Sequence, residues 1–199
     1  IRNSDYTIRE YICNFIMSKL ETNTIDTVSG TTNLIIGSTN SSTVTFESGA
    51  VTGHMSPSFY ATNGSTDQSI NDGTQTKVDF GTEILDSDSA FATSRFTVPS
   101  GKAGKYYIFS SVDLLESDSD MESHNIYFFK NGSASVSHVF NNTSASKIRR
   151  VSTYFGTIFD LSASDYIEIY FQFVGTAGNA ASIKANNAAT FFGGYRIGA

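Results

Sequence analysis

The chain of 199 residues has little cysteine, proline and charge, and it has no tryptophan. Its single cysteine, Cys13, cannot form a disulfide within the chain, so a core or oligomerisation must stabilise the fold. Only 16% of the residues are charged, and 13 Lys and Arg against 19 Asp and Glu give a net charge of −6. This balance argues against nucleic acid as a partner, because phosphate binding needs clustered Lys and Arg. No apolar run reaches the roughly 18 residues of a membrane span, so we expect no membrane insertion.

Aromatic and small polar residues are abundant instead. The sequence contains 10 Tyr and 16 Phe, and 39% of its residues are hydrophobic, which is enough for one sizeable core. Low charge together with many Ser, Thr, Asn and Gly is typical of an extracellular or virion surface protein made of strands and turns. Because the sequence begins at Ile1 and not at Met, we expect a processed product or part of a longer polypeptide.

Residues 1–22 are expected to form an amphipathic helix that anchors or trimerises the protein. Apolar side chains recur there at three- and four-residue spacings. They are Ile8, Ile12, Phe15, Ile16 and Leu20. Two heptads are too few to establish a coiled coil, so docking on the chain's own domain, docking on another protein and self-trimerisation all stay open.

Residues 23–56 have a different character. Short apolar stretches, at 34–36 and 44–46, alternate with Ser, Thr, Asn and Gly turns. The segment has too few apolar residues for a core of its own. We expect either a flexible linker or a stalk of short strands completed by identical neighbouring chains.

From residue 57 to residue 199 strand signals are dense and regularly spaced. The predicted strands are 57–62, 76–80, 92–98, 105–115, 124–130, 134–140, 150–161, 166–174 and 190–198. Asn131-Gly132 between two apolar stretches predicts a tight hairpin with positive φ at both turn positions. Many short strands without a helical period predict an all-β, antiparallel sandwich or jelly roll.

Several of these strands are apolar on both faces. In 105–115, for example, one face carries Tyr106 and Ile108, and the other carries Tyr107 and Phe109. One face must line the core, and a second face rich in Tyr is typical of an oligomer interface. The residues predicted at that interface are Tyr106, Tyr107, Phe109, Tyr154, Tyr166, Tyr170 and Tyr195.

The order of certain residues across 57–199 follows a known pattern. It comprises Phe80, Asp86, Phe91, Phe96, Pro99, Gly104 and Tyr106, then Lys130-Asn131-Gly132, then Leu161 and Asp165, and finally Phe192, Gly194 and Tyr195. In this order the residues resemble the globular head domain of the complement C-one-q family, which shares the tumour necrosis factor jelly roll. Phe91 to Phe96 is shorter than the family spacing, Phe96 to Gly104 is longer, and no collagen-like tract precedes the domain.

The resemblance implies a homotrimer with an inner sheet against the threefold axis. Under this reading neighbouring subunits, or the short strands before Phe96, cover the second face of residues 105–115.

No residue pattern indicates an active site. His54, His124 and His138 share no metal spacing, and nucleophile or phosphate-loop motifs are absent from the sequence. The candidate ligands for calcium are Glu116, Asp118, Asp120 and Glu122, which alternate in a predicted loop. A solvated acidic loop is the simpler explanation, so calcium is an option and no cofactor is required.

The sequence therefore predicts a non-enzymatic, homotrimeric structural or adhesive protein. We expect a bacteriophage tail or capsid fibre on the virion surface, docked to other virion proteins through residues 1–30 and touching a host receptor or glycan with its head. A secreted recognition or cytokine-like ligand is the alternative. A glycan-cleaving enzyme is a third class, which would need two carboxylates about 5 to 10 Å apart.

Overall fold

The computed structural model describes residues 55–117, 121–142, 148–185 and 188–198. The predicted N-terminal helix, with Ile8, Ile12, Phe15, Ile16 and Leu20, and nearly all of the predicted stalk lie outside these residues. Within them the chain forms 13 β-strands and no helix. No helix in this described part is long and apolar enough to cross a membrane.

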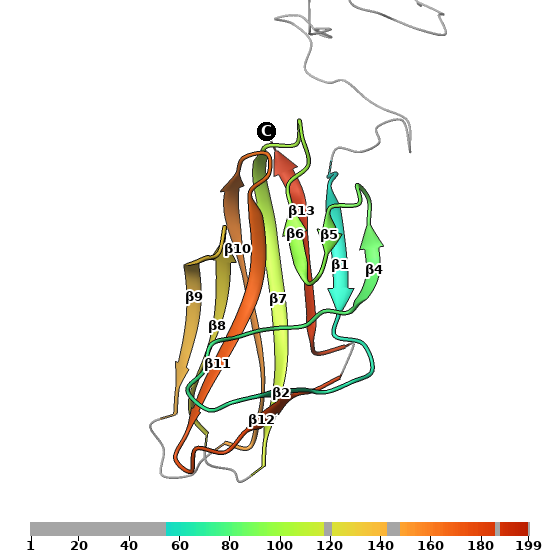
Figure 1. The fold of residues 1–199 in the computed structure, drawn as a ribbon. Helices are drawn as coiled ribbons and strands as arrows, with labels where there is room; N and C mark the ends of the chain where they lie inside the picture. Colours follow the sequence, from blue (N-terminus) through green and yellow to red (C-terminus); the bar gives the residue numbers. More distant parts are fainter. Residues whose placement is uncertain (1–54, 118–120, 143–147, 186–187, 199) are drawn as a thin grey trace, which may run out of the picture. The chain divides into compact units, whose positions relative to one another are not determined.

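The first sheet, sheet A, has seven strands (Figure 1). They are β1 (Ser58–Thr62), β2 (Gln68–Ile70), β4 (Thr82–Asp86), β7 (Gly104–Glu116), β10 (Arg150–Leu161), β12 (Ala181–Ile183) and β13 (Phe191–Gly198). The order is β2-β12-β7-β13-β1-β4, and β10 also pairs with β7. The long strand β7 is thus hydrogen-bonded to β10, β13 and β12, always antiparallel.

The second sheet, sheet B, has six strands. They are β3 (Thr76–Lys77), β5 (Phe91–Ala92), β6 (Arg95–Thr97), β8 (Met121–Lys130), β9 (Ser133–Asn141) and β11 (Tyr166–Gly175). The order is β5-β6-β11-β8-β9, with β3 beside β11, and every pair is antiparallel. The predicted all-β antiparallel sandwich is confirmed.

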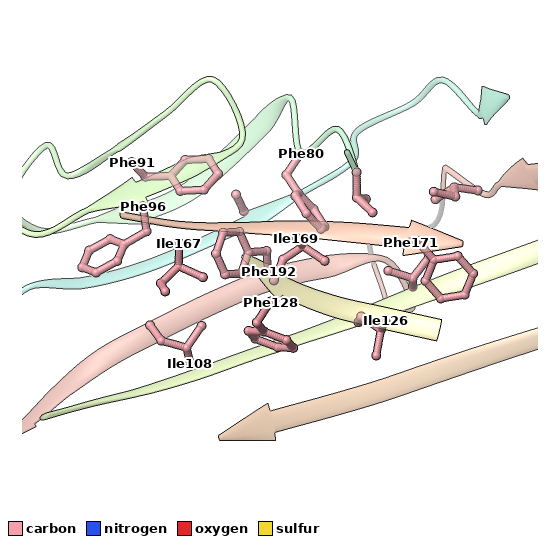
Figure 2. Close-up of a cluster of buried hydrophobic side chains, with 14 of the residues drawn as sticks. Phe80, Phe91, Phe96, Ile108, Ile126, Phe128, Ile167, Ile169, Phe171 and Phe192 are labelled. Carbon is pink, nitrogen blue, oxygen red and sulfur yellow. The ribbon is translucent and has the colours of Figure 1, made fainter. Parts of the chain in front are cut away.

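The core lies between the two sheets and is built from every second residue of the long strands. Figure 2 shows Ile108 and Phe192 of sheet A close to Phe128, Ile167 and other side chains of sheet B. All four are fully buried. Aromatic side chains such as Phe128 and Phe192 bury large areas and dominate core energetics.

Two tight turns at one end of the sandwich are locked together. Asn131 and Gly132 have φ values of 53° and 80°, which confirms the predicted hairpin. The Asn131 side chain accepts a hydrogen bond from the Tyr166 backbone N–H (2.9 Å) and donates one to Asp165 (2.8 Å). This bond, with those from Lys130 and the Ser162 backbone, lowers the pKa of Asp165 to about 2.

A buried histidine joins the two sheets near their β9 and β10 edges. Nε2 of His124, on β8, lies 2.6 Å from the hydroxyl of Thr153, on β10. The rings of Phe140 and Phe171 stack on the imidazole at centroid distances of 4.9 and 5.7 Å. Burial, and secondarily the nearby His138, lowers the pKa of His124 from 6.5 to about 4. The imidazole is therefore neutral at pH 7.

Acidification should destabilise the fold through His124. The unfolded chain protonates this residue near pH 6.5 and the folded chain only near pH 4, so the unfolded state binds more protons between these values. We expect the free energy of unfolding to fall by up to about 3 kcal/mol as the pH drops through this window. Urea denaturation of the wild type and of His124→Gln at several pH values measures the difference. Parallel curves for the two proteins would contradict this assignment.

Candidate functional site

The outer face of sheet A carries a continuous group of aromatic side chains, which we call the aromatic face. Its members are Tyr60 on β1, Tyr107 and Phe109 on β7, Tyr154 on β10, and Phe191 and Tyr195 on β13. Each one alternates with a buried inward residue, as Tyr107 does with Tyr106 and Ile108. The aromatic face is therefore a product of strand alternation in four neighbouring strands.

Phe109 lies at the centre of the aromatic face. Its ring centroid is 5.7 Å from that of Tyr107, 6.2 Å from Phe191, 6.4 Å from Tyr154 and 6.5 Å from Tyr60. The hydroxyls of Tyr107 and Tyr154 are 2.9 Å apart and share a hydrogen bond. That bond, together with partial burial, raises the pKa of Tyr154 to about 12, so the Tyr154 hydroxyl is neutral at physiological pH.

Two glycines let these rings lie close to the sheet. A Cβ atom at Gly193 would come within 2.7 Å of Cζ of Phe109, and one at Gly156 within 2.5 Å of the Tyr107 hydroxyl oxygen. Any side chain at these positions would push the rings outward. The glycines thus keep the aromatic face low and flat, a shape suited to contact with another surface.

Much of this surface is accessible in the single chain. Tyr154 is 54% exposed, and the neighbouring Ile158 on β10 is 58% exposed. Leu85, the register partner of Tyr60 on β4, is 48% exposed. An exposed apolar surface of this kind is typical of an interaction site.

A buried carboxylate paired with a partly exposed arginine borders the aromatic face on β7 and β10. The side chain of Asp113 is only 1% exposed, and it accepts hydrogen bonds from Nε (3.0 Å) and Nη2 (2.6 Å) of Arg150. The hydroxyl of Ser152 donates a third bond at 3.0 Å. Burying a carboxylate requires this kind of charged partner. The pair of Asp113 and Arg150 therefore holds the beginning of β10 against β7.

The predicted interface residues divide into three groups. Tyr107, Phe109, Tyr154 and Tyr195 lie on the aromatic face, whereas Tyr166 and Tyr170 alternate with buried residues of β11 and lie on the outer face of sheet B. The prediction for Tyr106 is wrong. This residue is fully buried between the sheets, where its hydroxyl donates to the backbone carbonyl of Lys102 (2.5 Å). Neighbours on one strand face opposite sides, so Tyr106 and Tyr107 could not share an interface.

Two members of the aromatic face, Tyr60 and Phe191, were not predicted. Both lie within predicted strands, and Tyr60 stacks on Phe191 at 5.5 Å. The signal that could have found them is the alternation of Tyr60 with Phe59 and of Phe191 with Phe192, since in each pair only one residue can point inward.

The predicted calcium ligands belong in part to strands and not to a loop. Glu116 is the last residue of β7 and is fully buried, and Glu122 is the second residue of β8. Asp118 and Asp120 lie outside the described residues. Among the residues that the structure does describe, no group of three or more His, Cys, Asp or Glu side chains is arranged to hold a metal ion.

Comparisons with known proteins rest on structure, since no protein family model and no curated protein matches the sequence. A solved murine APRIL at pH 5.0 matches with a TM-score of 0.51 and 16% identity over 70% of this chain and 98% of that one. Eiger TNF from S. frugiperda matches with a TM-score of 0.52 and 14% identity over 70% of this chain and 91% of that one. The fold is a jelly roll of the complement C-one-q and tumour necrosis factor type.

The globular domain of the zebrafish complement 1qA protein is also similar to this jelly roll, with 15% identity, a TM-score of 0.47 and coverage of 71% of this chain and 97% of that one. At 16% and 14% identity, the APRIL and Eiger structures show a common fold with this chain. In this jelly roll the aromatic face covers the sheet that contains the first and the last strand, β1 and β13.

Proposed function

We propose that this chain forms a non-enzymatic homotrimer through its aromatic face and serves as a structural or recognition head. The observation that carries the proposal is the flat aromatic surface centred on Phe109, over Gly156 and Gly193. Covering it in an assembly would remove a large apolar area from water. The resemblance to complement C-one-q heads supports three copies as the number that meets there.

The buried ionisable side chains support a structural role. Glu168 is bound by Lys77 (2.7 Å) and Arg95 (2.9 Å), and Asp113 by Arg150. These carboxylates hold strands together. Their hydrogen-bonding capacity is used by the fold itself, which favours a display scaffold over a reaction centre.

The two ends of the jelly roll suit a displayed head. The described chain enters at Met55, next to the start of β1, and β7 and β11 run from that end to the opposite one (Figure 1). We infer that the preceding residues attach the head to a larger particle and that the opposite end of the head, where β7, β9 and β11 terminate, faces outward. In the form we favour, the particle is a bacteriophage fibre and the outward end contacts the host.

A secreted recognition or ligand domain is the second candidate. The observation that favours it is the structural likeness to a murine APRIL and to an Eiger TNF, because the latter is named as a tumour necrosis factor. In that case the trimer is the same and only the attachment to a virion differs.

Static light scattering tests the assembly. A chain of 21.5 kDa should give about three times this mass, and the value should persist after a calcium chelator is added. A mass of one chain at micromolar concentration would overturn the proposal. Dissociation by the chelator would instead make a metal ion part of the interface.

A further inference from the structure

A polar cavity lies outside the aromatic face, between the hairpin of β5 and β6 and the segment that leads from β2 through β3. Its volume is about 490 Å³, which is within the range of about 300 to 1,000 Å³ typical of small-molecule sites. It is lined by Gln68, Lys77, Val78, Asp79, Thr93 and Ser94. The cavity reaches solvent, because Asp79 and Thr93 are exposed.

The turn that forms one wall has an unusual sequence for its shape. Thr93 and Ser94 have φ values of 51° and 57°, so two consecutive residues other than glycine occupy the left-handed region. The tight hairpin between β8 and β9 uses Asn131 and Gly132, which tolerate that conformation better. Residues kept in a disfavoured backbone conformation point to a role for their side chains.

Hydrogen bonds explain Ser94 but not Thr93. The Ser94 hydroxyl accepts a bond from the Phe80 backbone N–H and donates one to Oδ1 of Asp79, both at 2.8 Å. Among the described residues, the Thr93 hydroxyl and Oδ2 of Asp79 have no hydrogen-bond partner. The ammonium of Lys77 bonds Glu168 (2.7 Å) and the Thr93 carbonyl (2.9 Å), which leaves one of its three donors.

These groups select the ligand by charge and by hydrogen bonding. The Asp79 carboxylate would repel an anion, and the Lys77 ammonium, already paired with Glu168, does not compensate that repulsion. Together they offer an acceptor, a donor and, in Thr93, a hydroxyl that is both. A neutral ligand whose own hydroxyls both donate and accept satisfies all three. We infer that the cavity binds a sugar ring of a host or matrix glycan.

An aromatic surface adjoins the cavity and would extend the contact. Lys77 is the register partner of Tyr170 on the outer face of sheet B, and Tyr170 stacks on Phe129 at 4.1 Å. Both rings are partly exposed. This outer face is separate from the aromatic face, so it stays accessible in the proposed trimer. The inference rests on the proposed recognition role and names its ligand class.

Saturation-transfer NMR on the full chain tests the cavity with four probes: D-glucose, D-galactose, D-mannose and N-acetyl-D-glucosamine. We expect saturable transfer to at least one of them. Asp79→Asn and Thr93→Ala should each weaken that binding about tenfold or more, because a hydrogen bond to the ligand is lost. Thr93 is exposed, so its truncation leaves the fold intact, and Glu83→Gln on β4 is the matched surface control.

Light scattering of the same samples separates the two proposals. A trimer that transfers saturation to none of the four sugars, or whose two variants bind as well as the control, overturns the sugar site alone. A monomer that binds sugar in a manner dependent on Asp79 overturns the assembly alone.

Discussion

Tyr154→Glu should convert the trimer to a monomer. The side chain is 54% exposed in the single chain, so a carboxylate there is solvated and the fold loses little. In the assembled aromatic face the same carboxylate would be buried without a partner. An unpaired charge of this kind costs about 3 kcal/mol or more, so we expect association to weaken at least about a hundredfold. Light scattering across a dilution series measures the shift.

Val139→Glu provides the matched control for this substitution. Val139 is 52% exposed and lies on β9 of sheet B, away from the aromatic face. The substitution introduces the same charge at a similarly exposed apolar position. It should leave the mass unchanged. Dissociation by Val139→Glu together with persistence of the trimer in Tyr154→Glu would place the interface on sheet B.

Phe192→Ala should cause the largest loss of stability. Its ring is fully buried. The ring centroid lies 4.9 Å from that of Phe59, 5.4 Å from that of Phe80 and 5.8 Å from that of Phe91. Truncation would remove the shared partner of three aromatic rings and leave a cavity. We expect the free energy of unfolding to fall by about 3 to 5 kcal/mol. Urea denaturation in the Tyr154→Glu background measures it without a contribution from assembly.

Substitution of the adjacent residue, Phe191, should have a different effect from substitution of Phe192. Phe191 is on the aromatic face, so Phe191→Ala should lower the stability of the monomer less than Phe192→Ala and weaken the trimer instead. Equal losses in the monomer from both substitutions would mean that strand alternation does not divide β13 into a core face and an interface face.

Strand alternation made most of the fold predictable. Seven of the nine predicted strands each overlap one observed strand closely, and the Asn131-Gly132 hairpin forms as expected. The predicted strand 92–98 is instead the β5–β6 hairpin, with its turn at Thr93 and Ser94. The predicted strand 76–80 is shorter, because β3 covers only Thr76–Lys77. The strands β2, β4 and β12 were missed. β2 and β12 have three residues each and β4 has five, so their pairing depends on neighbours distant in the sequence and not on local pattern.

The faces of the strands were harder to assign. In β7 both faces carry aromatic residues, and only the position of sheet B decides that Tyr106 points inward. Glycines offered an overlooked signal, because Gly156 and Gly193 provide the space that Tyr107 and Phe109 require. Glu168 shows a further limit. Its partners Lys77 and Arg95 are 91 and 73 residues away, so no local pattern could pair them.

The position of β1 determines how the head withstands mechanical force. This strand receives the preceding chain, yet it is not an edge strand: it is hydrogen-bonded to β13 on one side and to β4 on the other. A pull transmitted through residue 55 must therefore break two ladders to extract the first strand. A head tethered through its N-terminal side would resist extraction better than one whose first strand lay at the edge of the sheet.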